Sequence, residues 1–132
     1  MADGWRELRS VGFTRAVGDI LFRTDRTGLE CGFLATGEVH NGNEDIVHGG
    51  ALMTFADIIL GFAASRAAKV AFCPTIQMTY QFAGSARLGD FISTTPEVVR
   101  ITSSLIFTRA LMHVGDRNIG TVDALFKRLH PR

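Results

Sequence analysis

The chain has 132 residues, of which 46% are hydrophobic and 20% are charged. This length suits one domain over residues 1–132, and this composition excludes an intrinsically disordered chain. The 14 Lys and Arg residues nearly balance the 13 Asp and Glu residues, which leaves a net charge of +1. That balance gives no electrostatic reason to expect nucleic acid or an acidic membrane as a partner. Low net charge on an apolar chain favours self-association, so we expect an oligomer.

The sequence shows no clear signal for export, membrane insertion or metal binding by cysteine. Residues 1–10 are charged and are not followed by the apolar run of a signal peptide. The longest apolar stretch, residues 51–64, is interrupted by polar residues and is too short to span a bilayer. Cys31 and Cys73 lack the spacing of metal ligands and are predicted to be buried, reduced thiols. We therefore expect a cytoplasmic protein.

The first third of the chain predicts short elements joined by turns. In chain order we expect a short helix over residues 2–9, strands over 13–23 and 28–36 with a turn at 25–28, and a polar loop over 38–47.

Residues 50–68 have a different composition. They are rich in Ala, Leu, Met and Phe, contain no Pro, and include only two charged residues, Asp57 and Arg66. Nineteen such residues are too many for a typical strand, so they predict a helix. Because this helix is apolar nearly all round, it should be enclosed on most sides.

The chain after Cys73 is rich in Ile, Val, Thr and Phe, as strands are. The predicted strands cover residues 75–83, 90–100, 103–114 and 118–129. Long antiparallel strands with one long apolar helix predict an α+β fold, in which a curved antiparallel sheet wraps around one central helix.

Asp57 is the most informative residue, because a carboxylate in the middle of an apolar helix is costly to bury. It could be a structural group that pairs with Arg66 or Arg87. It could also be a functional carboxylate that acts as a general base, or as a nucleophile toward a carbonyl carbon. The residues alone leave both readings open.

The tripeptide His48-Gly49-Gly50 opens the predicted helix. The first N–H groups of a helix lack internal partners, and glycines leave no side chain in the way of a ligand. Such a helix start can hold the oxyanion that forms when a thioester is attacked. A plain loop-to-helix turn, with His48 bonded to nearby backbone, is equally compatible with this tripeptide.

The spacing between these two features has a structural consequence. Asp57 lies seven residues after Gly50, which is roughly 10 Å along a helix. Both groups of one chain therefore cannot hold the same small reacting carbon. A symmetric dimer would solve this by facing Asp57 of one subunit with the helix start of the other.

Metal and cofactor signatures are missing from the sequence. His40, Asp45 and His48 have irregular spacing, so no metal is expected. No nucleotide-binding glycine motif and no G-x-S-x-G elbow occurs, so no cofactor is expected either.

Two motifs carry a resemblance to a known family. His48-Gly49-Gly50 with Asp57 resembles the HGG-x6-D signature of hotdog-fold thioesterases. Residues 82–90 resemble the aromatic-x-x-Pro-Ala-Arg-x-Gly-Asp turn of the same family, with Ser85 in place of the usual Pro. The likeness is to the phenylacetate-degradation (PaaI-like) branch with its THEM-type relatives, and it implies a hotdog fold.

The resemblance also implies roles for individual residues. By position, Asp57 matches the general base or nucleophile, the Gly49 N–H matches the oxyanion donor, and His48 matches a residue that lines the site. Thr75, which follows Asp57 by 18 residues, matches a hydroxyl that orients the attacking water.

A further family residue, an Asn or Gln, usually lies six residues before the His. That position is Gly42 here, and it is flanked by Asn41 and Asn43. A shift in the loop assigns the catalytic amide to Asn41 and leaves Asn43 as a substrate contact. Gly50 and Met53 are expected to contact substrate as well.

The function that the resemblance implies is acyl-CoA hydrolysis to free acid and CoA. It also implies a homodimer or homotetramer with active sites shared between subunits. The apolar residues Met53, Phe55, Ile58 and Gly61 suit an acyl pocket without identifying the acyl group. Two alternatives stay open: a hydratase or dehydratase on the same fold, whose His-Phe-Pro-type motif is missing here, and a non-catalytic acyl-CoA-binding module.

Overall fold

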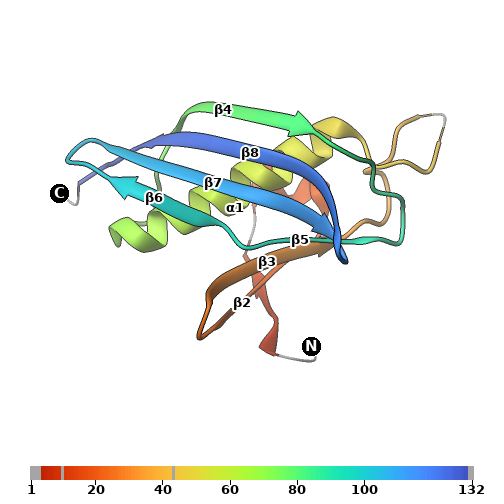
Figure 1. Cartoon of the computed structure of the whole chain (residues 1–132), viewed down its shortest axis with the longest axis horizontal. Helices are drawn as coiled ribbons and strands as arrows, with labels where there is room; N and C mark the ends of the chain where they lie inside the picture. Colours follow the sequence, from red (N-terminus) through yellow and green to blue (C-terminus); the bar gives the residue numbers. More distant parts are fainter. Residues whose placement is uncertain (1–3, 10, 43, 131–132) are drawn as a thin grey trace.

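The computed structural model describes residues 4–9, 11–42 and 44–130, and in it one curved sheet wraps around one long helix (Figure 1). The elements in chain order are β1 (Arg6–Leu8), the 3-10 helix η2 (Gly12–Val17), β2 (Ile20–Asp25), β3 (Gly28–Leu34), α1 (Gly49–Ala68), β4 (Thr75–Phe82), β5 (Phe91–Thr94), β6 (Glu97–Ile101), β7 (Leu105–Val114) and β8 (Arg117–Lys127).

All strand pairs of this sheet are antiparallel. The strand order is β1-β2-β3-β5-β7-β8-β4, and β6 also pairs with β7. The strand β4 therefore ends the sheet on one side, where it pairs with β8. This arrangement confirms the predicted α+β class with a curved sheet around a central helix.

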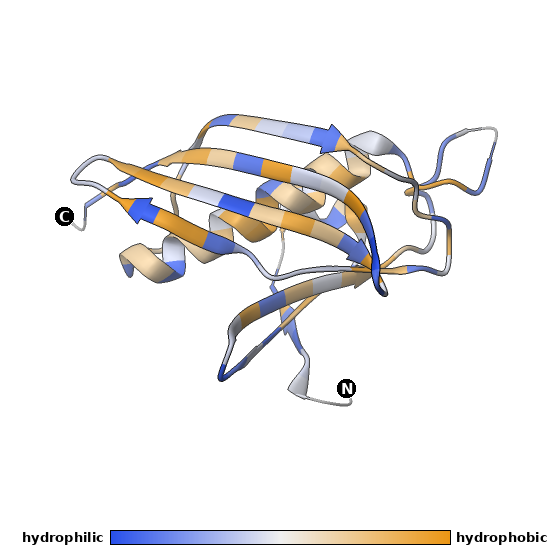
Figure 2. Cartoon of the chain, in the orientation of Figure 1, coloured by the Kyte–Doolittle hydropathy of each residue, from blue (hydrophilic) through white to orange (hydrophobic). Residues whose placement is uncertain are grey.

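The helix α1 supplies much of the core. Its buried residues, which include Leu52, Phe55 and Leu60, face the sheet, and the Phe55 ring packs on Phe33 with ring centroids 4.6 Å apart. Figure 2 shows hydrophobic residues along most of α1 and an alternation of hydrophobic and hydrophilic residues along the long strands. That alternation places one face of the sheet on the helix and leaves the other to solvent.

By length and composition α1 could also cross a membrane. It has 20 residues, its most apolar 18-residue window has a mean hydropathy of 1.4, and it is longer than the apolar stretch that the sequence suggested. Part of this helix, 39% of the most apolar window, is buried inside the domain. Packing under the sheet therefore gives the apolar residues of α1 a role in the core.

The amino-terminal region differs from the prediction. The expected helix over 2–9 is wrong, because Arg6–Leu8 forms the strand β1 on the edge of β2. The expected strand over 13–23 is instead a 3-10 turn followed by β2. Gly12 and Gly18 have positive φ angles of 66° and 92° at either side of that turn, and these bends interrupt an extended chain.

The expected strand over 90–100 is divided into β5 and β6. Thr95 and Pro96 separate the two segments, since proline cannot donate a backbone hydrogen bond to a neighbouring strand. The other predicted strands and the helix agree with the structure within a few residues.

The two cysteines are free and buried, as predicted. Burial raises the pKa of the Cys31 thiol to about 12, so this thiol stays protonated and unreactive at neutral pH. We expect a thiol reagent at pH 7.5 to label neither cysteine quickly in the folded protein, and to label both in denaturant. Fast stoichiometric labelling of the folded protein would contradict the buried positions.

Candidate functional site

Asp57 lies half-buried on α1, next to the first residue of β4. The Thr75 hydroxyl donates a hydrogen bond of 2.6 Å to Asp57 Oδ1. This contact joins two residues that are 18 positions apart and that the resemblance assigned to one site, although the hydrogen bond itself was not predicted. Because a hydroxyl holds one carboxylate oxygen, the orientation of the carboxylate is fixed.

The alternative reading of Asp57, an ion pair with Arg66 or Arg87, is not what the structure shows. The Arg87 guanidinium lies 2.8 Å from Asp45 instead. The Arg66 guanidinium lies over the Phe62 ring, 5.5 Å from its centroid. Among the described residues, Asp57 is therefore held by a neutral hydroxyl and is not paired with either of these arginines.

A bulge in β4 directs Thr75 toward the helix. Thr75 pairs with Phe126 and Gln77 pairs with Leu125, so Ile76 is one residue too many for a regular ladder. Phe126 is buried on the helix side of the sheet, and paired residues share a face. The extra residue thus lets Thr75 face α1 although Gln77 faces away from it.

The start of α1 leaves one backbone donor open. His48 caps the helix: its Nδ1 accepts from the Gly50 N–H at 2.8 Å, and its carbonyl accepts from Ala51 and Leu52. Within residues 4–9, 11–42 and 44–130, the Gly49 N–H has no hydrogen-bond partner. Since Nδ1 accepts, a neutral His48 carries its proton on Nε2. The structure thereby separates the capped Gly50 from Gly49, whose N–H can bind an anion.

A hollow of about 380 Å³ lies beside this helix start. Its walls come from η2, from the segment before the helix and from the first turns of α1: Phe13, Ala16, Val17, Glu38, Val39, His40, His48, Gly50, Ala51 and Thr54. The hollow is large enough for part of a small-molecule ligand.

One side of α1 remains partly open between Gly49 and Asp57. This side, which we call the open stripe of α1, consists of Gly50, Met53, Thr54, Asp57, Ile58 and Gly61. These positions recur at intervals of three and four residues, as one helix face does. Asp57 follows Gly49 by eight residues, which is about 12 Å along the axis. The structure therefore does not bring the two groups of one chain together.

The two predicted asparagines, Asn41 and Asn43, differ in what the structure describes of them. Asn41 is exposed on a short hairpin, and its backbone N–H donates to the Ile46 carbonyl at 2.7 Å. The same hairpin reaches His48, whose N–H donates to Val39 at 2.7 Å. Asn43 lies outside the described residues.

The residues expected to line an acyl pocket lie partly on the open side of α1 and partly in the core. Gly50, Met53, Ile58 and Gly61 belong to the open stripe of α1. Phe55 is fully buried in the core, so its expected place in an acyl pocket is wrong. Position 55 lies on the sheet side of the helix, two residues from Asp57 and therefore on a different face.

The sequence reading missed Phe82 as a neighbour of the helix start. A Cβ atom built on Gly49 would lie 3.2 Å from two carbons of the Phe82 ring, so the ring rests against this glycine. Phe82 is the aromatic position of the second motif, which was the available signal. Packing of β4 against the helix start could not be read from that motif.

Tyr80 is the neighbour of Phe82 on the same face of β4, and the two rings are 4.5 Å apart. In the part of the chain that the structure describes, the buried Tyr80 hydroxyl has no hydrogen-bond partner. Burial also raises the pKa of Tyr80 to about 12.

We expect Tyr80→Phe to leave the free energy of unfolding unchanged or to raise it by up to about 1 kcal/mol, because an unsatisfied buried hydroxyl costs stability. Urea unfolding of both proteins measures the difference. A loss above about 2 kcal/mol would show that the hydroxyl makes a stabilising bond.

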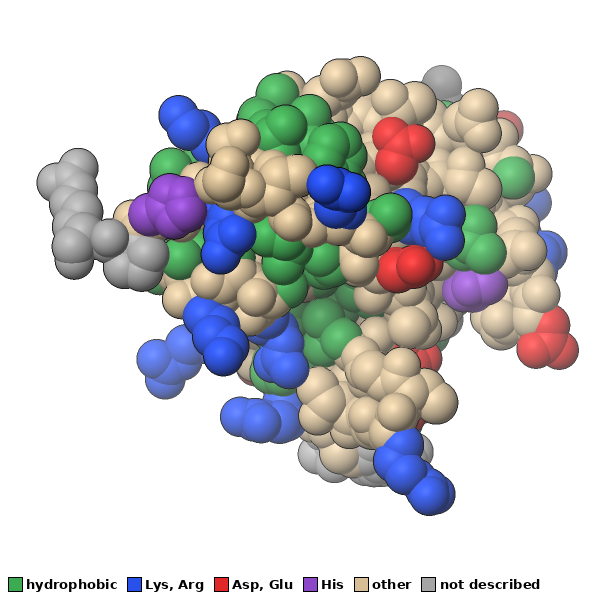
Figure 3. Space-filling model, turned by 60° about the vertical axis from the view of Figure 1, so that its left-hand side comes forward, with side chains coloured by type: hydrophobic (Ala, Val, Ile, Leu, Met, Phe, Trp, Pro, Cys, Tyr) green, Lys and Arg blue, Asp and Glu red, His purple; other side chains and the backbone are tan. Residues whose placement is uncertain are grey.

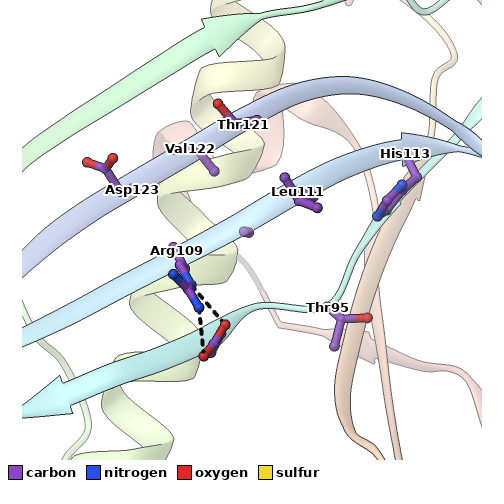
Figure 4. Close-up of a pocket in the computed structure, with 9 residues that line it drawn as sticks. Thr95, Arg109, Leu111, His113, Thr121, Val122 and Asp123 are labelled. Atoms are coloured by element: carbon purple, nitrogen blue, oxygen red, sulfur yellow. Dashed lines mark hydrogen bonds and ion pairs between the residues drawn. The ribbon is translucent and has the colours of Figure 1, made fainter.

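The outer face of the sheet holds a larger hollow of about 560 Å³. Figure 4 shows its lining on β7 and β8, where Arg109, Leu111 and Asp123 project away from α1. The Arg109 guanidinium is engaged by Glu97 at 2.9 Å, which raises the pKa of Arg109. None of the predicted site residues lines this hollow. Size alone therefore does not mark the functional site here.

Charged side chains do not identify a further ligand site. Figure 3 shows Lys and Arg side chains spread over one end of the molecule and separated by hydrophobic and polar atoms. No group of three or more His, Cys, Asp or Glu side chains in the described ranges is arranged to hold a metal ion.

Comparison with known proteins agrees with this architecture. A family model described as the thioesterase superfamily matches residues 44–121, which include the helix start and Asp57. A Pseudomonas aeruginosa protein named "Putative esterase PA0474" is 27% identical over 126 residues, which cover 94% of each chain.

Several solved structures share the fold. Zebrafish thioesterase superfamily member 2 superposes with a TM-score of 0.78 at 20% identity, over 91% of this chain and 88% of that one. The phenylacetic acid degradation protein PaaI of Thermus thermophilus, solved as a point mutant, gives 0.75 at 13% identity over 89% and 98%. A Streptococcus pneumoniae hypothetical thioesterase solved with coenzyme A gives 0.75 at 17% identity over 86% and 88%.

Proposed function

The chain belongs to the thioesterase superfamily, and from this premise we propose that it hydrolyses acyl-CoA thioesters to a free acid and CoA. The observation that carries the proposal is the pair of half-sites on α1. One is a carboxylate fixed by a hydroxyl, Asp57 with Thr75. The other is the open Gly49 N–H at the positive end of the helix. Together they supply a base or nucleophile and an oxyanion donor.

The proposed reaction needs no group beyond water. As a general base, Asp57 takes a proton from water while the water oxygen bonds to the thioester carbon. The carbonyl oxygen becomes an oxyanion that the Gly49 N–H binds. The carbon–sulfur bond then breaks, and the CoA sulfur leaves as a thiolate that takes up a proton. As a nucleophile, Asp57 would first form a mixed anhydride, which water then hydrolyses.

The separation of about 12 Å within one chain supports a shared site. If two copies of α1 pack antiparallel, a two-fold axis near Met53 places Asp57 of one copy opposite Gly49 of the partner subunit, because residue 53 is midway between them. Met53 is 36% exposed, in the middle of the open stripe of α1. The same arrangement would cover the stripe, and the hollow beside His48 would then hold part of the substrate.

The remaining roles are those that the resemblance implies. Thr75 would hold Asp57 and the attacking water, and the Nε2 proton of His48 is available to the substrate. By the resemblance, Asn41 would position the thioester, and Asn43, which lies outside the described residues, would contact the substrate. These assignments, a dimer or a tetramer, and a cytoplasmic location are parts of the proposal.

The first experiment measures thiol release from short, medium, long and aromatic acyl-CoA, with Asp57→Ala as the control. Release by the wild-type protein and its loss in the variant would support the proposal. Tight acyl-CoA binding without release over hours would instead favour a binding module. Reversible addition of water to an enoyl-CoA without CoA release would favour a hydratase.

A second experiment tests the shared site by complementation. Asp57→Asn and Gly49→Pro each remove one half of every site in a homodimer. When the two variants are co-expressed, half of the dimers are mixed, and each mixed dimer has one intact site. We expect about a quarter of the wild-type activity to return. No recovery in mixed dimers would show that each site lies within one chain.

A further inference from the structure

The strand β4 contacts both half-sites. Its first residue, Thr75, holds Asp57, and its last residue, Phe82, lies against Gly49. The strand ends one side of the sheet and runs along α1 between these contacts, as Figure 1 shows. A single strand, β4, thus contacts both the Asp57 carboxylate and the residue that carries the Gly49 N–H.

The Phe82 ring leaves little room for a side chain at position 49. A Cβ on Gly49 would lie 3.2 Å from both Cε1 and Cζ of the ring, which is tighter than ordinary van der Waals contact. The ring therefore occupies space that is open because residue 49 is a glycine. Yet 54% of Phe82 is exposed, so burial in the core is not what holds the ring there.

Two neighbours on β4 and β8 fix the position of this ring. Tyr80 packs on Phe82 at 4.5 Å with an interplanar angle of 37°. Tyr80 in turn covers the backbone of Gly120, where a Cβ would overlap its ring. Gly120 is also the cross-strand partner of Phe82. Two glycines, at 49 and 120, thus make room for one aromatic pair.

We infer that Phe82, held by Tyr80, is a positioning residue that sets the direction of the Gly49 N–H. This inference rests on the proposed function, because the N–H matters as an oxyanion donor. Stabilisation of an oxyanion depends on a donor fixed in advance at hydrogen-bond distance from the developing charge. Phe82 braces the first residue of α1, which lacks a side chain of its own to anchor it.

The inference predicts different effects on kcat and on KM. A group that aims an oxyanion donor acts in the transition state, so its loss lowers kcat and leaves KM nearly unchanged. We expect Phe82→Ala to lower kcat about 10-fold or more, with KM within about 3-fold of wild type. Phe82→Tyr keeps the ring and should retain most of the activity. Phe107→Ala is the matched control, since Phe107 is 39% exposed on the outer face of β7.

A double-mutant cycle tests the contact itself. Gly49→Ala keeps the N–H but adds the Cβ that crowds the ring, so it should lower kcat in the wild-type background. In the Phe82→Ala background the added Cβ meets no ring, so its effect on kcat should shrink several-fold.

The results of these experiments distinguish a failure of the positioning role from a failure of the proposed function. Equal effects of Gly49→Ala in both backgrounds, or a Phe82→Ala kcat equal to that of Phe107→Ala, would overturn the positioning role in an active enzyme. A wild-type protein that releases no thiol from any acyl-CoA would overturn the proposed function and the inference together.

Discussion

Asp57→Asn is expected to lower kcat/KM for thioester hydrolysis by about 100- to 10,000-fold, the range for loss of a general base. The amide has nearly the shape of the carboxylate, and its oxygen can still accept from Thr75. The change therefore removes the negative charge and the basicity with little change in packing. Thiol release from the best acyl-CoA substrate, fitted for kcat and KM, measures the effect.

Asp123→Asn is the matched control, because Asp123 is an exposed carboxylate on β8 that lines the outer hollow. It should retain wild-type activity, and thermal unfolding should show that both variants are folded. Activity of Asp57→Asn within about 3-fold of wild type would rule out both chemical roles proposed for the carboxylate.

The second large effect is expected from Gly49→Pro, which deletes the proposed oxyanion donor. Proline is favoured at the first position of a helix, where its missing N–H breaks no helical hydrogen bond. The preceding residue, His48, has φ −63° and ψ 134°, a conformation that a following proline accepts. Loss of one oxyanion donor costs about 100- to 1,000-fold in kcat, and we expect this loss relative to Gly49→Ala.

Gly49→Ala is the necessary comparison because both variants add a Cβ near Phe82, whereas only proline removes the N–H. The ratio of the two kcat values therefore reports the donor. Equal kcat values in two folded proteins would mean that another group binds the oxyanion.

Much of the fold was predictable because its elements have strong local signals. The run of residues 50–68 is too long and too apolar for anything but a central helix, and the structure starts it one residue earlier, at Gly49. The resemblance, rather than periodicity, assigned Asp57 and Thr75 to one site, and the structure adds the hydrogen bond between them. Nothing in local sequence relates a helix residue to a strand 18 positions later.

The predictions that were wrong or lacking also have physical reasons. The segment at 6–8 lacks strand character and becomes β1 only because the edge of β2 offers backbone partners. Phe55 is as apolar as Met53, but only the direction of the helix face decides which of them is buried. Phe82 gains its place from packing across β4 and α1. Such contacts between distant elements depend on tertiary structure and leave no pattern in the chain.

The bulge at Ile76 means that β4 can lose this one residue without turning the Thr75 hydroxyl away from α1. Ile76 is 52% exposed, and substitutions there change little of the core. Its deletion would join Thr75 directly to Gln77 in a regular ladder. Because successive residues of a strand face opposite sides and Gln77 faces away from α1, Thr75 would still face Asp57. Homologues that lack this residue are therefore best aligned with a one-residue gap at the bulge rather than by residue similarity.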